Sequence, residues 1–364
     1  MNFNDPKTHT LLNYFEDMNF TASQEPEGRV IKVYSDVNEE LNTLYNGVGL
    51  RNTSHMGIIE LKGADVLDFL HRITTNGLKD LKKEQVTQTI FTTEKGRIID
   101  VVEIINFETH QLMICSPIHK SKLKSWIDKY TISDDVKVID TENKYSIIDV
   151  LGPQANSFLM FICGGMINNI PENSFKIVNT EGLLFFVVRL NFGREQFRII
   201  ADNENAKGLV KFIDENKGPY EVNFIGEDAY EIYRVKAGIP KAPNELNDEY
   251  NPHEAGLKHI VNFTKGCYIG QEVIARLDTY DKVQYSLTGV KLNSENHELS
   301  SKALFDEEGK EAGEITSVVF APKLNRNIGL AYVRKAYDKE GIQLFSQNSN
   351  GKVPVTIVNL PFKR

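Results

Sequence analysis

The C-terminal part of the chain has a hydrophobicity pattern that few folds can accommodate. From about Tyr285 onward, short stretches rich in apolar and β-branched residues are separated by Asn, Gly and Asp. We predict strands at 286–292, 303–305, 311–321, 328–333 and 353–358. Short strands with turn residues at this spacing are typical of a small antiparallel barrel. The sequence therefore predicts a barrel over residues 284–364.

The chain before this region mixes strand and helix periodicities. A strand at 58–61 is followed by a helix whose apolar residues Val66, Phe69 and Ile73 recur at helical spacing. A second strand–helix unit begins near residue 145. With 364 residues the chain is too long for one ordinary core, so we predict two or three domains of the α+β class.

Composition excludes several classes of protein. The chain is 41% hydrophobic and 25% charged, which is typical of a soluble globular protein, and its net charge of −8 argues against nucleic-acid binding. Its apolar runs are too short to cross a bilayer, and the N-terminus lacks the pattern of a secretory signal. Three cysteines at wide spacing argue against disulfides and a zinc site. We therefore expect a cytoplasmic protein without a metal site or membrane partner.

The most unusual stretch is the octapeptide Lys265-Gly-Cys-Tyr-Ile-Gly-Gln-Glu272. Its glycines predict a turn that presents Cys267 and Tyr268, followed by a helix that starts near Gly270. A lone cysteine is usually a buried small hydrophobe. Here Lys265 and the helix N-terminus favour a thiolate, so we predict a lowered pKa and a reactive thiol at Cys267.

Asp100 interrupts an apolar strand, where it is flanked by Ile99 and Val101. A carboxylate in such a position must be solvated, paired or functional. The residues alone leave a structural ion pair and a site residue equally open. His55, taken alone, is more often a structural histidine than a catalyst.

Several motifs together resemble a known family. Lys-Gly-Cys-Tyr-x-Gly-Gln-Glu is similar to the signature of the YgfZ-like folate-binding proteins, relatives of the glycine-cleavage T protein, an aminomethyltransferase. Ser54-His-Met-Gly57 before a strand, a helix and a Thr-Asn turn also resembles the T-protein family, as do the segments 313–317, 327–331 and 360–362. The resemblance extends from about residue 48 to the end of the chain.

This resemblance implies a three-domain, cloverleaf architecture with two antiparallel α+β domains and a C-terminal β-barrel. The first domain would combine 1–55 with 145–240, and the second would combine 56–144 with 241–283. The barrel would occupy 284–364.

The resemblance also implies a site that binds tetrahydrofolate or a derivative. Asp100 matches the aspartate that faces the reacting folate nitrogen. Glu195 matches a glutamate that hydrogen-bonds the pterin, a role that suits a carboxylate facing two parallel N–H groups. Taken alone, Glu195 would be a surface carboxylate and Arg234 a helix-surface arginine paired with Tyr230 or Glu231. The resemblance thus implies Cys267 and Asp100 as catalytic residues, and it implies folate binding by Asp100, Glu195, Arg234, Met56 and Tyr268.

Three functions remain open on this basis. The first is a folate-binding accessory protein for iron–sulfur cluster assembly or repair, with iron–sulfur client or assembly proteins as partners. The second is a folate-dependent aminomethyltransferase, and the third is a scaffold that binds no folate. Two departures count against the second: Val101 stands where the family often has an acid, and Cys115 where transferases tend to have asparagine.

Overall fold

The computed structural model describes residues 11–141, 144–280, 282–292, 301–348 and 351–363. The chain forms two compact units. Unit 1 comprises Met1–Leu70, Gly77–Gln88 and Val102–Tyr230, and unit 2 comprises His71–Asn76, Thr89–Val101 and Glu231–Arg364. Each unit is therefore assembled from segments that are far apart in the sequence.

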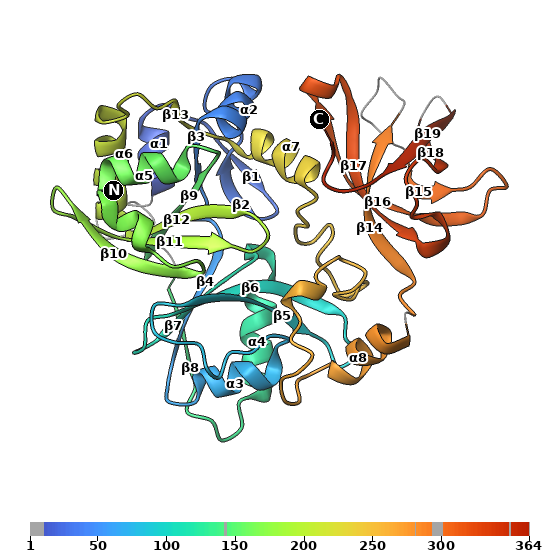
Figure 1. Ribbon diagram of the computed structural model, residues 1–364, viewed down its shortest axis with the longest axis horizontal. Coiled ribbons are helices and arrows are strands. Elements are labelled where there is room, and N and C mark those ends of the chain that lie inside the picture. Colours follow the sequence, from blue (N-terminus) through green and yellow to red (C-terminus); the bar gives the residue numbers. More distant parts are fainter. Residues whose placement is uncertain (1–10, 142–143, 281, 293–300, 349–350, 364) are drawn as a thin grey trace. The chain divides into compact units, whose positions relative to one another are not determined.

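Unit 1 contains a six-stranded sheet in the order β10-β11-β12-β9-β3-β13 (Figure 1). The strands are β3 (Val48–Asn52), β9 (Tyr145–Leu151), β10 (Ser174–Thr180), β11 (Leu183–Asn191), β12 (Glu195–Asp202) and β13 (Val222–Phe224). The neighbouring strands run antiparallel except for β13, which pairs parallel with β3. The expectation of a purely antiparallel sheet therefore needs this correction at one edge. A small hairpin, β1 (Ala22–Glu25) and β2 (Gly28–Ile31), lies in the same unit.

Helices pack against this sheet and complete its core. They are α1 (Leu11–Asp17), α2 (Val37–Asn46), α5 (Ala155–Cys163) and α6 (Asn203–Glu215). Helix α6 begins where the Asp202 carboxylate accepts a hydrogen bond from the backbone N–H of Asn205 at 2.8 Å, a standard N-cap arrangement. The core is apolar and includes Leu50, Val150, Phe158, Phe185 and Leu209.

A five-stranded sheet has the order β5-β6-β7-β4-β8. Its strands are β4 (Gly57–Lys62), β5 (Val86–Thr92), β6 (Ile98–Asn106), β7 (Gln111–Cys115) and β8 (Lys137–Asp140), and the accompanying helices are α3 (Val66–Ile73) and α4 (Lys120–Tyr130). Strands β5 and β6 contribute residues to both units. Every residue of β7 is buried, including Gln111, the polar residue at its start.

The C-terminal strands form a closed barrel in the order β14-β17-β16-β15-β18-β19, drawn in orange to red in Figure 1. They are β14 (Tyr285–Leu292), β15 (Ser301–Phe305), β16 (Glu311–Ala321), β17 (Arg326–Arg334), β18 (Gln343–Asn348) and β19 (Gly351–Val358). The predicted barrel is confirmed. Strand β18 was not predicted, because polar residues outnumber apolar ones in it. It nevertheless closes the barrel by pairing with β15 and β19.

Together these sheets confirm the predicted α+β class with a C-terminal barrel. The three domain boundaries stay predictions.

Helix α7 (Glu227–Ala237) follows β13, and α8 (Gln271–Tyr280) leads toward the barrel. No helix among the residues that the structure describes is long and apolar enough to cross a membrane.

Candidate functional site

The octapeptide 265–272, called here the octapeptide loop, turns and leads into a helix as the sequence predicts, but it exposes Cys267 and not Tyr268. Cys267 is exposed, and α8 begins at Gln271. Tyr268 is buried in a cluster that includes Ile98 and Ile274, and this burial raises its pKa to about 12. The loop therefore presents a thiol to solvent while its neighbouring phenol anchors it in the core of unit 2.

Gly270 is required by the backbone at the end of this loop. Its φ is +83°, which side chains rarely tolerate, and a Cβ atom there would lie 2.7 Å from the carbonyl oxygen of Thr93. The hydroxyl of Thr92 also donates to the carbonyl of Ile269 at 2.7 Å. The turn after β5 thus holds the C-terminal end of the loop closely.

Lys265 has a different role from the one predicted. Its Nζ donates to the backbone carbonyls of His71, Thr74 (2.6 Å) and Asn76 (2.7 Å) at the end of α3. An ammonium group has three N–H donors, so these bonds use all of them. Burial lowers the pKa of Lys265 to about 7. Lys265 therefore contacts carbonyls at and just after the end of α3, and its predicted support of a Cys267 thiolate stays a prediction.

Asp100 lies in β6 with 0% exposure. Its strand neighbour Ile99 is equally buried, whereas Val101 is partly accessible and packs against the cluster that contains Tyr268. A catalytic role for Asp100 thus requires that folate reach a carboxylate that is covered by protein. That role stays a prediction.

Glu195 begins β12, and its side chain is 43% exposed. One carboxylate oxygen accepts hydrogen bonds from Arg189 at 2.9 and 2.7 Å across the β11–β12 pair. This exposed ion pair matches the role of surface carboxylate that the residues alone favour. Nothing in its surroundings adds support for a pterin contact.

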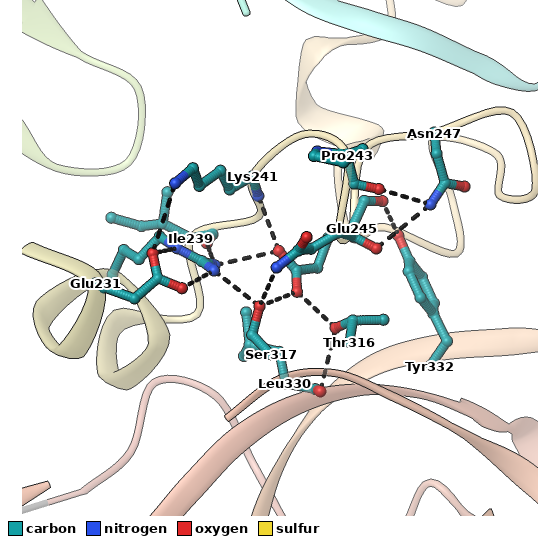
Figure 2. Close-up of polar contacts among 12 residues, drawn as sticks. Glu231, Ile239, Lys241, Pro243, Glu245, Asn247, Thr316, Ser317, Leu330 and Tyr332 are labelled. Carbon is teal, nitrogen blue, oxygen red and sulfur yellow. Dashed lines mark hydrogen bonds and ion pairs between the residues drawn. The ribbon is translucent and has the colours of Figure 1, made fainter. Parts of the chain in front are cut away.

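Arg234 is not a helix-surface arginine, because its side chain is only 1% exposed. It donates from Nε to Glu231 (2.7 Å), from Nη1 to Glu245 (3.1 Å) and from Nη2 to Ser317 (2.8 Å). Glu245, which is 0% exposed, also accepts from Thr316 (2.5 Å) and Ser317 (2.7 Å), as Figure 2 shows. Every guanidinium nitrogen is engaged within unit 2. This geometry favours a structural role over the predicted contact with folate.

Met56 lines a cavity of about 460 Å³ in unit 1. Polar and aromatic side chains share its wall, among them Tyr34, Asn52, His55, Tyr145 and Glu227. The Glu227 carboxylate accepts two hydrogen bonds of 2.8 Å from Arg51, which fixes its orientation. Of the predicted folate-binding residues, Met56 lines this cavity.

Sequence reasoning missed a buried network of charges in unit 1. Arg198 in β12 donates from Nε to Asp149 at 2.7 Å and also contacts Glu103. Arg51 lies 3.7 Å from the other oxygen of Asp149 and stacks on the ring of Tyr230 at 3.5 Å. Burial raises the pKa of Glu103, while Arg198 opposes this shift. Asp149 interrupts an apolar strand just as Asp100 does, and that signal could have identified it.

No group of three or more His, Cys, Asp or Glu side chains is arranged to hold a metal ion in the parts of the chain described above.

Comparisons with known proteins agree with this architecture. Residues 11–265 match the family model of the GCVT N-terminal domain, and residues 286–363 match that of the glycine cleavage T-protein C-terminal barrel domain. A putative chloroplastic transferase from Arabidopsis thaliana is 27% identical, over 89% of this chain and 74% of its own length. An aminomethyltransferase from Desulfitobacterium hafniense is 28% identical, over 85% of this chain and 84% of its own length.

The crystal structure of the glycine cleavage system aminomethyltransferase T from Bartonella henselae has the same fold. It superposes with a TM-score of 0.84 over 97% of both chains, at 20% identity. The narrower resemblance to YgfZ-like proteins is compatible with this fold and stays a prediction. Because the two matched domains cover most of its length, the chain belongs to the glycine cleavage T-protein family.

Proposed function

We propose that the chain binds tetrahydrofolate, or a derivative of it, and carries out a one-carbon transfer of the aminomethyltransferase type. The observation that carries this proposal is the match of both T-protein domains along one chain. Relatives named aminomethyltransferase, which align over most of their own length, add support.

The cavity that contains Met56 fits a heteroaromatic ligand of the size of a pterin. Its volume of about 460 Å³ falls in the range of small-molecule sites. Tyr34 and Tyr145 supply aromatic surface for a flat ring, and the carboxylate of Glu227 can accept N–H groups from an aminopyrimidine edge. In this proposal Met56 contacts the ring. The role that the family resemblance implies for Asp100, orienting the folate amine and assisting its deprotonation, is tested separately below.

Two measurements on the full chain test the proposal. Isothermal titration with tetrahydrofolate should show saturable binding that Met56→Ala weakens. Glu108→Gln serves as a matched control, because Glu108 lies in an exposed ion pair with Lys83, and it should bind like the wild type. If tetrahydrofolate does not bind, the proposal that it is the cofactor is refuted.

Incubation with aminomethylated lipoyl protein and tetrahydrofolate then tests the transfer itself. Release of ammonia that depends on folate is expected, and Asp100→Asn should reduce its rate while the affinity for folate changes less. If the chain binds folate but releases no ammonia, the proposed transferase activity is refuted and the proposed folate site still stands.

A second function is favoured by the exposure of Cys267 on a firmly held loop. Here the folate-binding chain assists iron–sulfur cluster assembly or repair through its thiol. A single cysteine cannot hold a cluster, so a partner would supply the other ligands. Cys267→Ser should spare folate binding and abolish rescue of iron–sulfur enzyme activity in cells that lack the native factor. Full rescue by this variant would exclude a thiol role.

A further inference from the structure

The octapeptide loop is fastened at both ends to different parts of unit 2. At its C-terminal end, Ile269 and Gly270 contact the turn that follows β5. At its N-terminal end, Lys265 reaches the last turn of α3. Gly266 and Cys267 lie between these two attachments and are exposed. The position of the thiol is therefore set by contacts that its neighbours make.

The attachment at Lys265 is chemically matched to a helix terminus. The last carbonyls of a helix have no partner within the helix, and the helix dipole favours a positive charge at this end. The lysine amine donates to the carbonyl of His71 in the last turn of α3 and to those of Thr74 and Asn76 in the segment that follows the helix. The Tyr268 ring lies 4.9 Å from the same Nζ, so the anchored phenol and the amine pack together.

The chain just before Lys265 is joined to the same segment. The backbone N–H of Asn262 donates to the carbonyl of Thr75 at 3.0 Å, and the hydroxyl of Thr75 donates to the carbonyl of Ile260 at 3.1 Å. The Asn262 side chain accepts from the backbone N–H of Lys265 at 3.1 Å. Lys265 therefore stands where the chain leaves this bonded segment and enters the exposed part of the loop.

We propose that Lys265 is a positioning residue for Cys267, which ties the octapeptide loop to the C-terminal end of α3. Without its amine, the carbonyls of His71, Thr74 and Asn76 lose one donor. The loop keeps the backbone bond from Lys265 to Asn262, the buried ring of Tyr268 and its attachment near Gly270, so its N-terminal half is held less firmly. The thiol then samples many positions instead of one. This role holds for either proposed function, because it concerns the place of the thiol and not the reaction.

A spin label attached to Cys267 tests this role. Cys267 is the exposed cysteine, so brief treatment with a methanethiosulfonate label modifies it first, and mass spectrometry of the peptides verifies the site. Lys265→Met has a side chain of similar length without donors, whereas Lys265→Arg keeps a charged donor group. Lys258→Met is a matched control, since Lys258 lies in the same stretch and pairs with Asp278 at the surface.

The expected result is a clear increase in label mobility in Lys265→Met, with amide exchange at residues 266–269 at least about tenfold faster. Lys265→Arg should restore both measurements toward those of the wild type, and Lys258→Met should leave them unchanged. An unchanged spectrum in Lys265→Met, or equal loosening in Lys258→Met, would overturn the proposal.

The wild-type protein gives an answer even if Lys265→Met does not fold. Below the pKa of about 7, a 1H–15N spectrum of lysine side chains should contain an ammonium signal with slow proton exchange. This signal should be missing in Lys265→Arg. If no lysine ammonium in the wild type is protected from exchange, the tie to α3 does not persist in solution and the proposal fails.

Discussion

Replacing Arg234 with methionine separates a structural role from a ligand-binding role. The substitution keeps an apolar side chain of moderate length and removes the cation next to Glu245. Both partners of this pair are almost completely buried, with 1% and 0% of the side chain exposed. Breaking a buried pair by removing one partner typically costs about 3–5 kcal/mol, because the remaining charge stays buried.

The lower end of this range applies to Arg234→Met. Glu245 would keep hydrogen bonds from Thr316, from Ser317 and from the backbone N–H of Lys241. Hydrogen bonds to a charged group contribute about 1.5–3 kcal/mol each and continue to stabilise the carboxylate. We therefore expect a loss of about 3 kcal/mol, which corresponds to roughly a hundredfold increase in local opening.

Hydrogen exchange of the amides in β16 measures this change, because Thr316 and Ser317 belong to that strand. Adding Glu245→Gln to Arg234→Met removes the unpaired charge and should recover part of the loss, giving a coupling energy from the double-mutant cycle. The reasoning would be refuted if Arg234→Met left amide exchange in β16 unchanged and strongly weakened folate binding. That pattern would mean that Arg234 faces the ligand.

Four further results are expected. Cys267 should react with iodoacetamide much faster than the other two cysteines in the native protein, as peptide mass spectrometry can show, because Cys115 is buried, Cys163 is half-buried and Cys267 is exposed. Gly270→Ala should destabilise the chain by about 1–3 kcal/mol in denaturant titrations, because it strains the backbone and crowds a carbonyl oxygen. Arg198→Met should cost about 3–5 kcal/mol, measured by amide exchange in β12, since it leaves buried acids without their cation. The fold lowers the pKa of Lys265 from 10.5 to about 7, so the unfolded chain binds more protons between these values. The wild type should therefore gain stability relative to Lys265→Met as the pH rises from about 7 to 10, and a constant difference would contradict this.

Local patterns in the sequence predicted the barrel and the turn before α8, because both depend on residues close together in the chain. Local patterns do not predict β18, because its sequence is mostly polar. Its position is set by pairing with β15 and β19. An exposed Cys267 agrees with the predicted turn that presents the thiol. The family resemblance gave the T-protein architecture at the level that the domain matches confirm.

The site residues were harder to place, because their environment depends on distant segments. Arg234 is buried by contacts with Glu245 and Ser317, and no pattern within its own helix indicates these partners. The sequence predicts that the charge of Lys265 acts on the neighbouring thiol of Cys267. The carbonyls that Lys265 binds lie far earlier in the chain, and His71 is 194 residues away. Periodicity shows which face of an element is buried, but it does not show which charges meet there.

The network around Arg198 also constrains how this chain can evolve. Arg198 comes from β12, Glu103 from β6 and Asp149 from β9, so the same guanidinium holds together three strands of two sheets. Loss of Arg198 removes the cation that contacts Glu103 and leaves Asp149 only the more distant Arg51 at 3.7 Å, and that intermediate is disfavoured. We therefore expect Arg198, Glu103 and Asp149 to change together in evolution. A homologue should keep all three residues or replace all three.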